Sequence, residues 1–81
     1  MADRLTGIYR GIVIDDKDPL NLGRLYISVP VEPGTTGWAM ACAPYDGSNS
    51  VTTPTVGTNI WVMFEGGDPM YPVWMGWYPT K

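Results

Sequence analysis

The sequence lacks histidine altogether and has a single cysteine, Cys42, among its 81 residues. Without histidine, the Ser-His and Cys-His pairs of nucleophilic enzymes are excluded, and no ordinary zinc site can be built. One cysteine cannot form an internal disulfide, and its apolar setting, WAMACAPY, predicts a small buried side chain. Because a chain of this length has a small core, we expect contact with partner chains to supply the missing stability.

Basic residues are few and dispersed. Five Lys and Arg against eight Asp and Glu give a net charge of −3. A protein that binds nucleic acid through its phosphates gathers basic residues on one face, and this sequence has no basic cluster. No stretch is long and apolar enough for a signal peptide or a membrane span. We therefore expect no nucleic acid partner, no membrane insertion and synthesis in the cytoplasm.

The acidic residues favour turns over catalysis. Asp15, Asp16 and Asp18 fall in one expected turn, and Glu65 and Asp68 fall in another. Acid–base catalysis needs a desolvated carboxylate, which solvated turns do not provide. The first group lacks the spacing of an EF-hand calcium loop, and the glycines of EGGDP lead into no helix that would hold a phosphate. The sequence predicts no enzyme activity, no catalytic residue, no metal and no cofactor.

Glycine and proline are abundant, at ten and eight residues, and they leave no window for a long helix. Five segments read as β-strands, and the long polar segment 44–58 reads as a loop. The predicted strands span residues 7–15, 24–30, 37–43, 59–65 and 71–78. We expect a single domain, residues 1–81, with an all-β fold: a small five-stranded antiparallel barrel of the OB type. A Src-homology-3-like barrel is the second choice.

Two of the predicted strands are apolar on both faces. In residues 59–65, Ile60, Val62 and Phe64 alternate with Trp61 and Met63. A strand of a small barrel should have one wet face, so the second apolar face predicts contact with a partner or another subunit. The predicted contact residues are Trp61, Met63, Tyr71, Trp74, Trp77 and Tyr78.

The same aromatic residues leave two other functions open. OB barrels often stack single-stranded nucleic acid on aromatic rings, although the basic groove that normally accompanies them is missing here. Exposed tryptophans also fit a binder of cell-wall glycans. The platform for nucleic acid would consist of Trp61, Trp74, Trp77, Tyr26 and Tyr78.

Several motifs resemble one family. YRGIVIDDKDPLNLGRLYISVP resembles the first two strands of the OB domain in phage baseplate hub-and-spike proteins. This group includes the N-terminal domain of the tail lysozyme of T-even phages, and the valine-glycine repeat spikes of type VI secretion are similar. The matching residues in this half are Tyr9, Gly11, Asp18, Pro19, Leu22, Gly23, Arg24 and Pro30.

The second half of the chain also resembles this family. GWAMACAPY is similar to its tryptophan-containing third strand, and VGTNIWVMFEGGDPMYPVWMGWY to its fourth and fifth strands. The two glycines of EGGDP are suited to the positive φ of a tight hairpin, and Asp68 and Pro69 redirect the chain. The matching residues here are Trp38, Gly57, Phe64, Gly66, Gly67, Asp68, Pro69 and Pro72.

The resemblance implies a homotrimeric virion structural protein of a phage tail baseplate or related contractile injection system. In the family, this domain packs against the central hub and leads into a spike. It also implies assembly in the host cytoplasm. Family members usually continue into a lysozyme domain or a β-helix, whereas this sequence ends at Lys81. The expected partners are therefore a hub protein and a separate spike or tip protein, unless the sequence is truncated.

Overall fold

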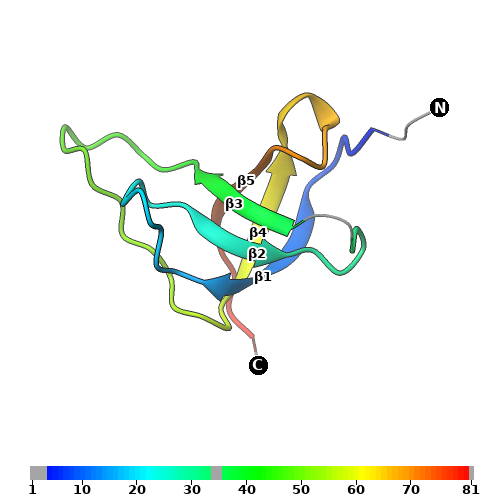
Figure 1. The fold of residues 1–81 in the computed structure, drawn as a ribbon, viewed down its shortest axis with the longest axis horizontal. Coiled ribbons are helices and arrows are strands. Elements are labelled where there is room, and N and C mark those ends of the chain that lie inside the picture. The colour runs from blue at the N-terminus through cyan, green and yellow to red at the C-terminus, as the bar shows by residue number, and fades with distance from the viewer. Residues whose placement is uncertain (1–3, 34–35, 81) are drawn as a thin grey trace.

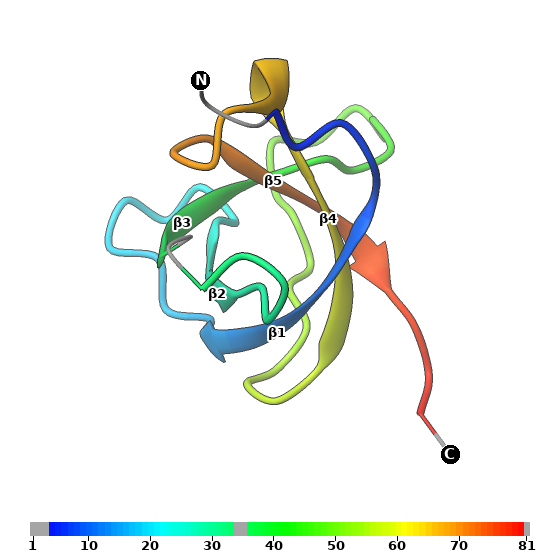
Figure 2. The same cartoon turned by 90° about the vertical axis from the view of Figure 1, so that its right-hand side faces the viewer.

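The computed structural model describes residues 4–33 and 36–80, so Lys81 and the first three residues lie outside it. Its elements are β1 (Tyr9–Asp15), β2 (Leu25–Ser28), β3 (Thr36–Ala41), β4 (Asn59–Phe64), the 3-10 turn η1 (Glu65–Gly67) and β5 (Pro72–Trp77). The strands close into a barrel in the order β1-β2-β3-β5-β4 (Figures 1 and 2). The predicted all-β, five-stranded OB-type barrel is confirmed. Within the described residues, no helix is long and apolar enough to cross a membrane.

One strand pairing differs from the prediction. β3 and β5 are parallel, with Met40 opposite Val73 and Ala41 opposite Trp74, whereas the other four pairings are antiparallel. The prediction of a wholly antiparallel barrel is wrong for a geometric reason. Strand directions can alternate around a closed ring only when the number of strands is even. A closed barrel of five strands therefore contains at least one parallel pair.

The core consists of the inward-facing side chains of all five strands. The alternation predicted for residues 24–30 and 59–65 is confirmed, because Leu25, Ile27 and Ile60 are fully buried. Full burial of one such side chain stabilises the fold by about 1.5–3 kcal/mol relative to exposure. The buried hydrophobic residues are Val13, Leu25, Ile27, Val29, Ala39, Ile60, Val62, Phe64 and Trp74.

The inner face of β1 brings two backbones close together. Gly11 and Val13 are buried and Ile12 is exposed, so the glycine keeps the alternation of the strand. A Cβ atom on Gly11 would lie 3.0 Å from Val62 Cγ2 and 3.1 Å from the Ser28 carbonyl oxygen. A side chain at this position would push against both neighbouring strands, which explains the glycine in an otherwise β-branched strand.

The chain leaves the barrel after β3 in a long loop, residues 42–58, which projects to the left in Figure 1. The Cys42 backbone N–H donates to the Trp74 carbonyl at 2.9 Å and makes the last link between these two segments. The Cys42 side chain is exposed, so the prediction of a buried cysteine is wrong. Its apolar neighbours in sequence do not cover it because the chain diverges from the sheet at this residue.

Gly11→Ala tests the close approach at β1. We expect the free energy of unfolding to fall by about 1–3 kcal/mol, because the added methyl group overpacks the space against Val62 and Ser28. Urea unfolding followed by circular dichroism measures the change. Gly7→Ala is the matched control, since its Cβ would be 3.8 Å from the nearest atom. Equal stability of the two variants would contradict the close approach.

Candidate functional site

Trp74, predicted to contact a partner, lies in the core. Only 5% of the residue is exposed. Its indole Nε1–H donates to the Gly23 carbonyl oxygen at 3.1 Å, which satisfies the one polar group of the ring. It lies opposite Val62 in the β4–β5 pair and shares the inward face of that residue. The prediction of an exposed Trp74 is therefore wrong, and the residue stabilises the barrel.

A β-bulge next to Trp74 changes which way the end of β5 faces. Val62 lies opposite Trp74, but the preceding residue, Trp61, lies opposite Gly76. Met75 is therefore the extra residue of the bulge, and 38% of it is exposed. A bulge of this kind shifts the inside–outside alternation of the strand by one residue.

The bulge places Trp77 at an open end of the barrel. Trp77 lies opposite Ile60, whose side chain faces inward, so the two share the inner face. Strict alternation from Trp74 would have put Trp77 on the outside. It is nevertheless 63% exposed, because no further strand residue covers this end. Trp77 is accessible as predicted, but from the barrel end instead of the outer sheet face.

Trp61 and Tyr78 lie on the outer face of the barrel and pack against Arg10. The ring centroids of Trp61 and Tyr78 are 4.7 Å apart. The Arg10 guanidinium carbon lies 5.4 Å from the Trp61 ring centroid and 5.1 Å from that of Tyr78. Cation–π contacts of this kind stabilise by about 0.5–1 kcal/mol at exposed sites. No local pattern marks Arg10, because its position opposite Trp61 depends on the pairing of β1 with β4.

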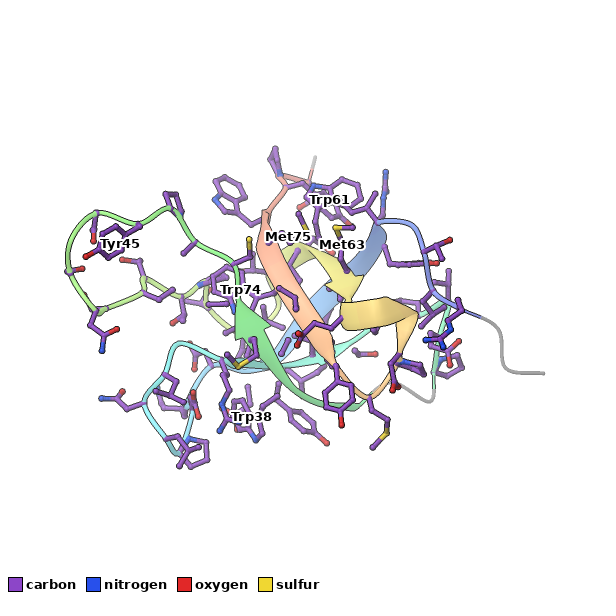
Figure 3. The ribbon with its side chains drawn as sticks, turned by 90° about the horizontal axis from the view of Figure 1, so that it is seen from above. Trp38, Tyr45, Trp61, Met63, Trp74 and Met75 are labelled. Carbon is purple, nitrogen blue, oxygen red and sulfur yellow. The ribbon has the colours of Figure 1, made fainter. Side chains whose placement is uncertain are left out.

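Two methionines extend this apolar surface. Met63 is 40% exposed on β4, and Met75 is exposed on the neighbouring β5. Figure 3 shows Trp61, Met63 and Met75 on the same side of the barrel. These three residues are called the β4–β5 outer face below. The prediction that β4 has apolar residues on both faces is confirmed, and Met75, which follows the inward-facing Trp74, extends the outer one.

A second aromatic pair lies on the other side of the barrel. Tyr26 and Trp38 meet edge to face with their centroids 5.4 Å apart, and Arg24 lies 5.7 Å from the Trp38 ring centroid. In Figure 3, Trp38 lies across the barrel from Trp61. The proposed nucleic acid platform combined residues from both sides with the buried Trp74. These rings do not form one surface, so the structure does not favour single-strand binding.

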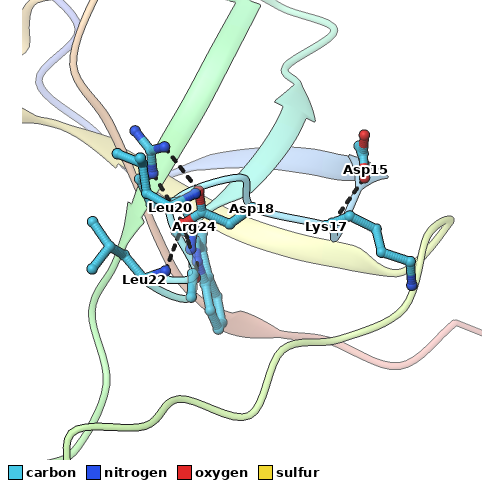
Figure 4. A network of polar contacts seen from close by, with 8 residues as sticks. Asp15, Lys17, Asp18, Leu20, Leu22 and Arg24 are labelled. Atoms are coloured by element: carbon cyan, nitrogen blue, oxygen red, sulfur yellow. Dashed lines mark hydrogen bonds and ion pairs between the residues drawn. The ribbon is translucent and has the colours of Figure 1, made fainter.

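Asp18 organises the turn between β1 and β2 (Figure 4). The backbone N–H groups of Leu20, Leu22 and Arg24 donate to its carboxylate at 2.9, 2.9 and 3.1 Å. The Arg24 side chain donates through Nε at 3.0 Å and Nη2 at 2.8 Å, which makes a bidentate pair. Only 4% of the Asp18 side chain is exposed. This turn, which includes the exposed Pro19, explains the Asp-Pro and Gly-Arg elements of the family motif.

The same contacts keep Asp18 ionised. The Arg24 hydrogen bonds, followed by those from the three backbone N–H groups, hold the pKa of Asp18 well below its ordinary value of 3.8, although burial opposes them. The pair in turn raises the pKa of Arg24. Asp18 is thus a poor proton donor or acceptor at neutral pH. Among the described residues, no group of three Cys, Asp or Glu side chains is arranged to hold a metal ion.

Gly23 joins this turn to the long loop. It has a φ of +77°, and a Cβ there would lie 2.7 Å from the Val51 Cβ. Val51 packs against the core from the loop, at a place where a side chain on Gly23 would displace it. Further along the loop, the Gly57 N–H donates to the Val13 carbonyl at 2.8 Å. The sequence of the loop did not predict that Val51 packs against the core, because one valine among polar residues has no periodicity.

The corner that follows β4 contains the most specific part of the family motif. Gly66 and Gly67 have φ values of +60° and +76°, as predicted, but they form a 3-10 turn and not a tight hairpin. A second turn follows, in which the Asp68 carboxylate accepts from the Met70 N–H at 2.9 Å. The Arg4 side chain donates to the Gly66 carbonyl at 2.6 Å, so the N-terminal segment lies across the corner.

The remaining motif residues at this corner are structural. Phe64 is buried and meets Tyr9 edge to face, with ring centroids 5.6 Å apart. Pro72 is buried as the first residue of β5, and Pro69 is half-buried in the turn before it. Tyr71, a predicted contact residue, is 59% exposed.

The comparisons with known proteins agree with this architecture. The model of a family described as the type VI secretion system/phage-baseplate injector OB domain matches residues 9–78. The match includes all five strands and every residue of the predicted motif. No sequence among the curated proteins matches the chain.

Asp18→Asn tests the turn through the pH dependence of stability. Because folding lowers the pKa of Asp18, its contribution is present above the ordinary value of 3.8 and is lost as the pH falls below it. We expect the variant to be less stable than the parent at pH 7, with a difference that shrinks as the pH falls below about 4. Thermal unfolding between pH 7 and pH 2 measures this. Asp16→Asn is the control, because within the described residues the one ion pair of the Asp16 carboxylate is with the exposed Lys17, at 3.7 Å. A constant difference at all pH values would contradict the assignment.

Proposed function

This chain belongs to the injector OB-domain family of type VI secretion systems and phage baseplates, and we propose that it is a non-enzymatic structural connector. In this proposal it assembles as a homotrimer and joins a central hub protein to a separate spike or tip protein. Its place is the tail baseplate of a virion, or the corresponding part of a contractile injection system, after assembly in the host cytoplasm.

The observation that carries the proposal is the apolar β4–β5 outer face. Trp61, Met63 and Met75 lie together on a barrel whose interior is already filled by other side chains. An apolar surface that the core does not need is typical of protein–protein contact, and Trp and Met are enriched in interfaces. The Arg10 side chain holds the Trp61 ring in place, so less side-chain entropy is lost on binding.

The two ends of the barrel support a connecting role. The N-terminal segment and the corner at Glu65–Gly67 lie at one end, and the tail that follows β5 lies at the other (Figures 1 and 2). Leu5 N–H donates to the Gly67 carbonyl at 3.0 Å, and Tyr78 N–H donates to the Asn59 carbonyl at 3.0 Å. Both ends are therefore fixed to the barrel by backbone hydrogen bonds. A rigid body with two distinct ends is suited to contacting two different proteins.

The carboxylates support a role without catalysis. The most shielded one, Asp18, is occupied by Arg24 and by backbone N–H groups. Asp15, Asp46 and Asp68 each accept from a backbone N–H two residues further along the chain. These are turn-forming contacts, each made through Oδ1 of the carboxylate, and they are typical of Asp in turns.

Met63→Asp tests the interface. We expect the variant to keep the fold, because Met63 faces outward, and to weaken self-association by at least about tenfold, because a charge would be buried in the interface. Light scattering over a range of concentrations, with circular dichroism for the fold, measures both. Met70→Asp is the control: Met70 is 77% exposed at the corner, away from the β4–β5 outer face. A parent chain that remains monomeric at every concentration would contradict the homotrimer.

Trp74→Asp tests whether Trp74 is a core residue or an interface residue. Because Trp74 is buried and donates to the Gly23 carbonyl, a carboxylate there would be buried without a partner. We expect a loss of about 3–5 kcal/mol or more, which would unfold a domain of this size. Circular dichroism of the purified variant measures it. A folded Trp74→Asp variant that fails only in assembly would restore Trp74 as an interface residue.

A further inference from the structure

An open groove lies at the end of the barrel where β5 stops. It has a volume of about 640 Å³, within the range of roughly 300–1,000 Å³ found for small-molecule sites. On the strand side it is lined by Trp77, Tyr78 and Asn59, at the adjacent ends of β5 and β4, and on the loop side by residues that include Thr52 and Thr53. Figures 1 and 2 show the second half of the long loop and the tail after β5 at this end of the barrel.

Both walls are held in place by backbone hydrogen bonds. On the loop side, the Val13 N–H donates to the Thr58 carbonyl at 3.0 Å and the Thr58 N–H to the Thr55 carbonyl at 3.1 Å. On the other side, Tyr78 is fixed through its N–H to the Asn59 carbonyl, and its ring packs against Trp61. The groove is therefore already formed in the free chain, and binding would require little reordering.

The lining of the groove combines aromatic rings with uncharged polar groups. Within residues 4–33 and 36–80, the side chains of Thr52, Thr53 and Asn59 make no hydrogen bond. Hydroxyl and amide groups supply both donors and acceptors, so these three side chains can bind a ligand that offers both. Trp77 presents a large, 63% exposed ring to the same space.

The chemistry of the lining narrows the class of ligand. Among the described residues, which end at Thr80, no Lys, Arg, Asp or Glu side chain lines the groove, so they offer nothing to pair with a phosphate, a carboxylate or an ammonium group. A purely apolar ligand would leave the threonine hydroxyls and the Asn59 amide without partners. A neutral, hydroxyl-rich ring satisfies both conditions, because its C–H face packs on an aromatic ring while its edge exchanges hydrogen bonds.

We infer that this groove binds a neutral oligosaccharide, with Trp77 as the stacking residue and with Thr53 and Asn59 as hydrogen-bonding residues. The inference does not rest on the proposed assembly, because its stacking residue, Trp77, is at the barrel end and is not part of the β4–β5 outer face, although Tyr78 borders both surfaces. A baseplate component with such a groove would contact surface glycans in addition to its protein partners.

The test is a titration of the ¹⁵N-labelled chain with two neutral trisaccharides, chitotriose and cellotriose, followed by NMR. We expect chemical-shift changes at residues 52–59 and 77–80, with a dissociation constant on the order of 1 mM. The two sugars differ in their acetamido groups, so their relative affinities show whether the groove prefers N-acetylated sugars. Absence of shifts in this groove with both sugars at millimolar concentration would overturn the inference.

Substitutions in the lining test whether the sugar binds in this groove. Trp77→Ala should weaken binding by about tenfold, and Thr53→Val, which keeps the shape but removes the hydroxyl, by about threefold or more. Tyr71→Ala removes an equally exposed aromatic ring at the opposite corner and should leave binding unchanged. Circular dichroism verifies that each variant is folded. Equal affinity of Trp77→Ala and the parent would also overturn the inference, whereas the mass of the assembly reports separately on the proposed function.

Discussion

Closure of a barrel with an odd number of strands explains much of the remaining structure. Five strands cannot alternate in direction around a ring, so β3 and β5 must run parallel. Their contact is short because β3 leaves the sheet after Cys42, whose N–H makes the last bond to Trp74. From that point the long loop, and not a strand, lies beside the end of β5. The exposed cysteine, the loop and the open barrel end all follow from this single departure.

Trp74 and Asp18 together compensate for the short closure. Trp74 fills the core beside the parallel pair and donates to the Gly23 carbonyl in the turn between β1 and β2. Asp18 fixes the same turn through Arg24 and three backbone N–H groups, and Gly23 leaves room for Val51. The long loop is thereby connected to the core without a disulfide or a metal. A small domain gains rigidity here from one buried ring and one ionised carboxylate.

The same geometry separates the exposed aromatic residues into different surfaces. The bulge at Met75 leaves Met75 and Trp61 on the outside and turns Trp77 toward the barrel end. One surface is apolar and pre-organised by Arg10, which suits contact between proteins. The other combines Trp77 with threonine and asparagine side chains, which suits a neutral polar ligand. A single interruption of the alternation thus gives one short β-strand two chemically different exposed surfaces.

The strands, the core residues with period-two alternation, the positive φ of Gly66 and Gly67 and the family are all predictable from the sequence, because these depend on neighbouring residues. The alternation of Leu25, Ile27 and Val29 is such a local signal, and so is the Asp18 turn with its Gly-Arg ending. The parallel pair, the contact of Arg10 with Trp61, and the burial of Trp74 beside the exposure of Trp77 emerge only in the folded barrel. These depend on register, closure and one bulge. Register is set by residues that meet across strands far apart in the chain, and no local pattern records which of them will meet.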